Sequence, residues 1–172
     1  MQTPVLVISG PVGVGKTTVG EEVSEVLDEQ SVPHTFTDFD QLRYTYPRIP
    51  EDPWSNGLGL QNLESIWKNC WARGARNLVI STVVEEQEFL DKLALVIPNA
   101  KVTIFQLFAS PENLIQRVSK REIGSGLEWH TNRAIELLAI LENAPCDARI
   151  ETDDRTIQDL AQTIADMVQW ER

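Results

Sequence analysis

The fold is decided by the stretch Gly10-Pro11-Val12-Gly13-Val14-Gly15-Lys16-Thr17. It follows the short apolar run Val5-Leu6-Val7-Ile8, and apolar residues recur at helical spacing after it. The stretch has the pattern G-x-x-x-x-G-K-[ST] between a strand and a helix. Glycines let successive backbone N–H groups turn toward phosphate oxygens, and the helix adds the positive end of its dipole. The stretch therefore predicts a phosphate-binding loop.

The residue types of this loop assign a role to each part of it. Lys16 has the length to reach the β- and γ-phosphates of a nucleotide, and the Thr17 hydroxyl is a ligand suited to Mg²⁺. The alternative is a glycine-rich turn before an ordinary helix, which the strand and helix on either side disfavour. The expected nucleotide-binding residues are Gly10, Pro11, Val12, Gly13, Val14, Gly15, Lys16, Thr17 and Thr18.

Composition bounds the class of protein. The 172 residues fit one domain with a core of its own. A net charge of −11, from 15 basic and 26 acidic residues, disfavours nucleic acid as a partner, because backbone binding needs a basic surface. No apolar run approaches the roughly 20 residues that span a bilayer, and the first residues lack a secretory pattern. We therefore expect a cytoplasmic protein without a membrane partner.

Short apolar runs alternate with helical periods along the chain. The runs at 5–8, 33–38, 77–82, 101–108 and 147–152 are predicted strands, and the segments between them are mostly helical. This alternation is typical of an α/β fold with a parallel sheet. A segment at about 41–73 begins with many prolines and aromatic residues, which favours a substrate-side insertion over a linker. We expect one domain over residues 1–172.

The opening VLVISGPVGVGKTTVGEEV, residues 5–23, resembles the small-molecule kinases of the P-loop NTPase superfamily. These include the adenylate, shikimate and gluconate kinases and the chloramphenicol phosphotransferases. The resemblance implies a three-layer fold with a five-stranded parallel sheet in the order 2-3-1-4-5, helices on both faces, and a short lid at about 117–130. It also implies ATP and Mg²⁺ as cofactors. The run Val79-Ile80-Ser81-Thr82 lacks a terminal acidic residue, which weighs against a mechanochemical ATPase of the motor or AAA type.

Two carboxylates, Asp38 and Asp40, follow the second predicted strand. Open α/β sheets bind ligands at the carboxyl ends of their strands, and the two residues share a face if the strand continues that far. A kinase needs one carboxylate for Mg²⁺ and one to orient or deprotonate the attacking hydroxyl. The resemblance favours Asp38 as the metal-side acid and Asp40 as the base, although the roles could be exchanged. Alternatively, both cap the next helix.

Arginines mark the predicted lid. Arg117 and Arg121 are spaced to project from one helix face, and a Gly-Ser-Gly break follows at 124–126. In the kinases that this chain resembles, such arginines close over the phosphates and stabilise the transferring group. The alternative is a solvated basic face paired with nearby glutamates. Arg133, beyond the break, is a weaker candidate.

Two further segments carry candidate binding residues. Thr152 and Asp153 fall where the resembled kinases form part of the adenine pocket, although the simpler role of their segment is to cap the helix that follows, and both can be true. Arg43 and Tyr44 are expected to bind the acceptor together with Asp40. The aromatic residues and arginines around them suit an anionic or ring-bearing acceptor, and three more candidates there are Tyr46, Arg48 and Trp54.

These observations lead to one hypothesis and its rivals. We expect an ATP- and Mg²⁺-dependent phosphotransferase that acts on a hydroxyl or phosphate of a small molecule, as a monomer or homodimer. One alternative is an ATP-binding regulatory module or slow ATPase without an acceptor. A polynucleotide-end kinase is disfavoured by the acidity, and the missing N-K-x-D guanine signature argues against a GTPase.

Overall fold

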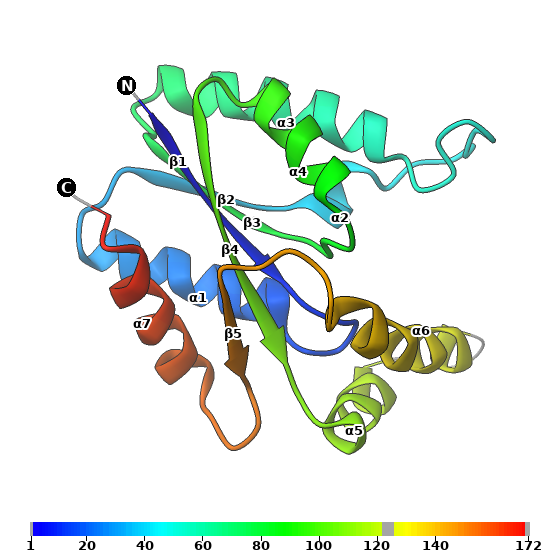
Figure 1. Cartoon of the computed structure of the whole chain (residues 1–172). Helices are drawn as coiled ribbons and strands as arrows, with labels where there is room; N and C mark the ends of the chain where they lie inside the picture. Colours follow the sequence, from blue (N-terminus) through cyan, green and yellow to red (C-terminus); the bar gives the residue numbers. More distant parts are fainter. Residues whose placement is uncertain (1, 122–125, 171–172) are drawn as a thin grey trace.

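A computed structural model describes residues 2–121 and 126–170 of the chain. Its centre is a five-stranded, all-parallel sheet in the order β2-β3-β1-β4-β5 (Figure 1). This confirms the predicted fold class and strand order. The strands are β1 (Thr3–Ser9), β2 (His34–Asp38), β3 (Asn77–Ser81), β4 (Ala100–Phe108) and β5 (Ala148–Glu151).

Helices cover both faces of the sheet and one end of it (Figure 1). One face carries α1 (Lys16–Glu29) and α7 (Ile157–Val168), and the other carries α3 (Asn56–Ala72) and α4 (Gln87–Val96). Beyond the carboxyl end of β4, α5 (Pro111–Arg121) packs against α6 (Gly126–Leu141). None of the helices in the described ranges combines the length and apolar character that crossing a bilayer requires.

The central strand β1 supplies both hydrophobic cores. Leu6 and Ile8 belong to the core under α1 and α7, whereas Val5 and Val7 belong to the core under α3 and α4. All four side chains are at most 1% exposed. A strand covered on both faces is apolar at every position and not at alternate ones, which explains the continuous run that precedes the loop.

The sheet brings the expected site residues to one edge. Ile8 of β1 and Asp38 of β2 are both register partners of Ser81 in β3. The ends of these three strands therefore lie beside one another, and the loop at 10–15 starts from the same edge. This is the edge at which open parallel sheets bind their ligands.

The short helix α2 (Phe39–Leu42) corrects one expectation. Strand β2 ends at Asp38, so Asp38 and Asp40 do not share the face of a continuing strand. Asp38 instead caps α2, because one of its carboxylate oxygens accepts a hydrogen bond of 2.9 Å from the backbone N–H of Asp40. The predicted insertion at about 41–73 consists of the end of α2, a loop at 43–55, and α3.

Candidate active site

The loop at 10–15 takes a conformation that its glycines make possible. Gly10, Gly13 and Gly15 have φ angles of 146°, 83° and 101°, a region that other residues rarely adopt. A Cβ atom on Gly13 would lie 2.6 Å from Cγ2 of Val118, so the inner side of the loop packs directly against α5. A Cβ on Gly15 would meet nothing within 4 Å. The outer side of the loop is therefore open.

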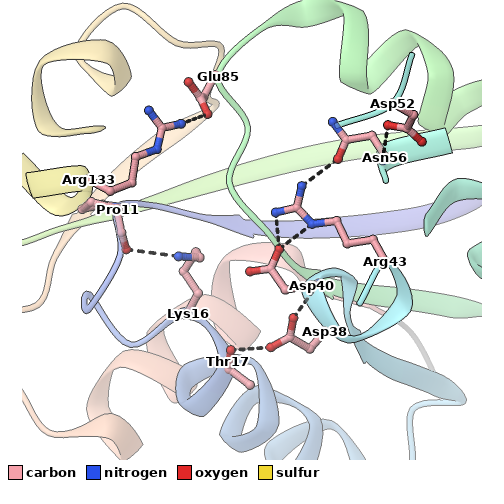
Figure 2. Close-up of polar contacts among 10 residues, drawn as sticks. All are labelled: Pro11, Lys16, Thr17, Asp38, Asp40, Arg43, Asp52, Asn56, Glu85 and Arg133. Atoms are coloured by element: carbon pink, nitrogen blue, oxygen red, sulfur yellow. Dashed lines mark hydrogen bonds and ion pairs between the residues drawn. The ribbon is translucent and has the colours of Figure 1, made fainter. Parts of the chain in front are cut away.

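The first turn of α1 faces this open side. Gly15 is its N-cap and offers no side-chain acceptor to the first backbone N–H groups of the helix. Such N–H groups, together with the helix dipole, form an anion-binding site. Lys16 donates a hydrogen bond of 3.1 Å from Nζ to the carbonyl of Pro11, across the loop (Figure 2). This bond holds its ammonium group against the loop.

Thr17 and Asp38 meet at the edge of the sheet. The Thr17 hydroxyl donates a hydrogen bond of 2.6 Å to the Asp38 carboxylate oxygen that does not cap α2 (Figure 2). A hydroxyl and a carboxylate are hard oxygen ligands, which suit Mg²⁺. No cluster of three or more His, Cys, Asp or Glu side chains suited to a metal occurs among the described residues. The pair fits an ion such as Mg²⁺, which commonly takes its other ligands from phosphates and water.

Ser81 adds an unsatisfied hydroxyl at this edge. Its side chain is 1% exposed, and within the described ranges its Oγ has no hydrogen-bond partner. Buried hydroxyls are normally hydrogen-bonded, so this atom marks a place for a ligand or an ordered water. Ser81 and Thr17 line the same cleft. The sequence offered this signal, since a polar residue ends a wholly buried strand, but we had not predicted a role for it.

Asp40 is the start of a chain of polar contacts that leads away from the loop. Arg43 donates from Nε to Asp40 at 2.9 Å and from Nη1 to the Asn56 side chain at 2.7 Å (Figure 2). Asp52 accepts hydrogen bonds of 2.8 Å from the backbone N–H groups of Asn56 and Gly57. The chain holds Asp40 in place and connects α2 to the start of α3. Arg43 is thus occupied by protein partners on both sides.

A cleft of about 910 Å³ joins these features. It is lined by the phosphate-binding loop and the first turn of α1, the ends of β2 and β3, α2, the loop at 43–55, the start of α3, α4 and α6. Arg133 of α6 lines the cleft and pairs with Glu85, the first carboxylate after β3, and with Glu136 at 2.8 Å. The sequence had ranked Arg133 below Arg117, because spacing along a helix does not reveal which arginine faces the cleft.

Arg117 lies in a second cluster, outside the lining of the cleft. It donates from Nη1 to Oγ1 of Thr152 at 2.8 Å and to the carbonyl of Val14 at 3.4 Å, and its Nη2 lies 3.6 Å from Asp153. It therefore connects α5 to both the phosphate-binding loop and the segment expected to hold adenine. Arg121 is the last residue of α5, and its side chain and residues 122–125 of the expected lid lie outside the described residues.

The charge of Asp153 is stabilised within this cluster. Burial acts to raise the pKa of its carboxyl group, but hydrogen bonds from Ser110 and Asn113 and the charge of Arg117 outweigh that effect. The pKa of Asp153 consequently lies below its ordinary value of 3.8. One of these bonds, of 2.8 Å from the Ser110 backbone N–H, ties the segment after β5 to the start of α5.

Of the predicted site residues, the structure gathers most in one cleft. The cleft contains Val12, Gly13, Gly15, Lys16, Thr17, Thr18, Asp38, Asp40, Arg43 and Tyr44. A separate cluster holds Arg117, Thr152 and Asp153. Residues of the cleft that we had not assigned include Ser81, Glu85 and Trp129. They come from elements far apart in the sequence, so only the folded chain reveals them as neighbours.

Comparison with known proteins identifies a family and similar structures for this chain. Residues 6–138 match the family described as AAA domain. A tunicamycin resistance protein from Deinococcus radiodurans is similar in structure, with a TM-score of 0.67, 20% identity, and coverage of 99% of this chain and 98% of that one. A sugar kinase from a Janibacter species has a TM-score of 0.65, 23% identity, and coverage of 99% and 96%.

A third similar structure is the Mycobacterium tuberculosis APS kinase in complex with AMPPNP and APS. It has a TM-score of 0.65, 18% identity, and coverage of 98% of both chains. A comparison with curated protein sequences finds no significant match. The chain therefore belongs to the AAA domain family and has the fold of the P-loop small-molecule kinases.

Proposed function

We propose that the protein is an ATP- and Mg²⁺-dependent phosphotransferase that moves the γ-phosphoryl group of ATP to a hydroxyl or phosphate of a small molecule. The observation that carries this proposal is the separation of two carboxylates in one cleft. Asp38 is bonded to Thr17 of the phosphate-binding loop, whereas Asp40 is held by Arg43 on the opposite side. Binding ATP alone would require only the first of these. The family match covers the nucleotide-binding core and leaves the reaction open.

On the nucleotide side, the backbone N–H groups of the loop and Lys16 would hold the phosphates. The Thr17 hydroxyl and the Asp38 carboxylate would hold Mg²⁺. When bound, this ion would neutralise charge that develops on the phosphates during transfer. The buried Ser81 hydroxyl would form a hydrogen bond to a water molecule at that metal site. Thr152, Asp153 and Arg117 would contact the adenosine part, since Arg117 joins Thr152 to the carbonyl of Val14 in the loop.

On the acceptor side, Asp40 would orient the attacking hydroxyl and take its proton. The acceptor oxygen forms a bond to the γ-phosphorus, and the bond from that phosphorus to the bridging oxygen breaks. The electron pair of the broken bond leaves with ADP, and the proton passes through the Asp40 carboxylate to solvent. Arg43 would position Asp40, and Tyr44 would contact the acceptor. Arg133 would face the transferring group from α6, with Arg117 and Arg121 of the expected lid completing its charge stabilisation.

We also propose a cytoplasmic enzyme of one domain, active as a monomer or homodimer. Cys70 and Cys146 are free thiols, which suits a reducing compartment.

The test is the rate of ADP formation with Mg·ATP across nucleosides, nucleoside monophosphates, sugars, sugar acids and hydroxyl-bearing antibiotics. Lys16→Ala serves as the blank, since any activity of the site depends on phosphate binding. We expect at least one acceptor to raise the rate well above the acceptor-free value, with a phosphorylated product. Uniformly slow hydrolysis despite tight ATP binding would instead support the regulatory module.

A further inference from the structure

We propose that the acceptor is a polyhydroxylated ring compound that carries no anionic group, with amines tolerated. This inference rests on the proposed phosphotransferase function and narrows its substrate class. Three features of the cleft lead to it, namely paired cations, excess carboxylates and an aromatic rim.

The cationic side chains on the acceptor side are already neutralised by the protein. Arg43 is bonded to Asp40, Lys92 to Glu88 at 2.7 Å, and Arg133 to Glu85. The remaining one, Arg48, is exposed and has no ion pair within the described ranges. An anionic acceptor needs cationic groups that are available to it, as in sites where arginine forks bind carboxylates or phosphates. At the other three cations, binding such an acceptor would require existing ion pairs to break.

Carboxylates exceed cations in this part of the cleft. Apart from Asp38, the carboxylates that line it are Asp40, Glu51, Asp52, Glu85, Glu86 and Glu88. Ionised carboxylates can only accept hydrogen bonds. Hydroxyl and ammonium groups can donate to them, whereas a carboxylate or phosphate on the ligand could not and would be repelled. The donor and acceptor pattern therefore favours a ligand rich in hydroxyl groups.

An aromatic rim completes the description of the ligand. Trp54 and Trp129 line the cleft from the loop at 43–55 and from α6, and each is 51% exposed. Tyr44, also in the lining, is 87% exposed. Large exposed aromatic side chains gathered at a concave surface mark a binding site. Their flat, apolar faces suit the C–H face of a saturated ring or the face of an aromatic one, while the carboxylates take its hydroxyl groups.

The test offers each ring scaffold in forms that differ in charge. The forms are neutral hexoses, aminohexoses, hexonates and hexose 6-phosphates, together with inositol and inositol phosphate, and nucleosides and their monophosphates. ADP formation is measured with Mg·ATP at low and high salt. We expect the neutral or amine form of the active scaffold to exceed its anionic form at least tenfold in kcat/KM. Raised salt should narrow the difference, because it screens repulsion by the carboxylates.

The outcomes separate this inference from the function on which it rests. If the anionic form of a scaffold is preferred, the substrate class is wrong and the phosphotransferase function stands. If no scaffold raises ADP formation, and none quenches tryptophan fluorescence in the presence of Mg·ADP, both fail.

A pair of variants tests the aromatic rim. Trp129→Ala should raise the KM of the active acceptor at least fivefold and leave the affinity for ATP unchanged. The control is Leu95→Ala, since Leu95 is 84% exposed on α4 and does not line the cleft. A KM for Trp129→Ala within twofold of the control would overturn the role of the rim.

Discussion

The two ends of the cleft are constructed in different ways. The proposed phosphate-binding end consists of the backbone of one continuous segment, whose three glycines adopt positive φ angles and whose last glycine is the N-cap of α1. The proposed acceptor end consists of side chains from α2, the loop at 43–55, the turn after β3, and α6. A site made of backbone groups is formed by consecutive residues, whereas a site made of side chains depends on how elements distant in the sequence pack together. Few substitutions should therefore be tolerated at the first end. At the second end, a substitution should impair one function of the cleft and leave the others in place.

The largest expected effect is a loss of transfer at one end of the cleft without a loss of ATP binding at the other. Asp40→Asn should lower kcat by about 10²- to 10⁴-fold, the range for loss of a general base, and leave ATP affinity within a few fold. Asp91→Asn, an exposed change on α4, is the control. Steady-state rates and titration calorimetry measure the two quantities. Transfer that survives in Asp40→Asn would show that Asp40 is not the base.

A matched pair of glycines tests whether the phosphate-binding end depends on open backbone. Gly15 and Gly74 have φ angles of 101° and 113°, and a Cβ on either meets nothing within 4 Å. Substitution by alanine at either position should therefore lower the free energy of unfolding by a similar amount, about 1–2 kcal/mol, because the backbone is strained. Only Gly15→Ala should also lose ATP affinity, by about tenfold, because its methyl group would occupy the space next to the phosphates. Equal ATP affinities in the two variants would contradict this explanation.

Ser81→Ala should produce a smaller effect, confined to the metal. Removing a buried hydroxyl that lacks a partner should leave the melting temperature unchanged or slightly raised. The affinity for Mg·ATP should fall about threefold, while affinity for ATP in EDTA should not change. Ser65→Ala on α3, where the hydroxyl bonds to a backbone carbonyl of its own helix, is the control. An equal loss of ATP affinity with and without Mg²⁺ would show that Ser81 does not belong to the metal site.

The smallest expected effect concerns pH. Because the pKa of Asp153 is lowered in the folded protein, its charge contributes stability above the ordinary value of 3.8, and this contribution is lost as pH falls through the lower folded value. Asp153→Asn should therefore reduce the melting temperature at pH 7, and the difference from the unchanged protein should shrink toward pH 3. Asp154→Asn, its exposed neighbour, should show no such trend. A difference that is constant with pH would assign the effect to lost hydrogen bonds alone.

The fold was largely predictable from sequence for physical reasons that act locally. The run at 5–8 is apolar at every position because β1 is buried on both faces. Thr156 caps α7 by accepting from the backbone N–H of Asp159, three residues further on, at 3.1 Å. The helix α2 was missed because its four residues are too few for a periodic pattern. It exists because Asp38 caps it and Phe39 is fully buried.

The candidate site was predictable only where its residues directly follow a predicted strand. Residues 12–18 and the two aspartates could be assigned from their place after β1 and β2. The pairing of Arg133 with Glu85 joins residues 48 positions apart, and no local pattern indicates it. Arg43 illustrates the same limit, since its position suggested an anion-binding role, yet its guanidinium group is bonded to Asp40 and Asn56. Which charges remain available is a property of the folded chain.

The strand order has a consequence for how the protein is made. Strands β1 and β2 are separated in the sheet by β3, which pairs with both. No native strand pair can form until residues 77–81 have left the ribosome, so the apolar β1 and the phosphate-binding loop wait while α1, β2, α2 and α3 are synthesised. During that interval the strand depends on α1, or on a chaperone, to cover it. The same strand order that gives β1 its two buried faces leaves it without a partner strand until β3 has been made.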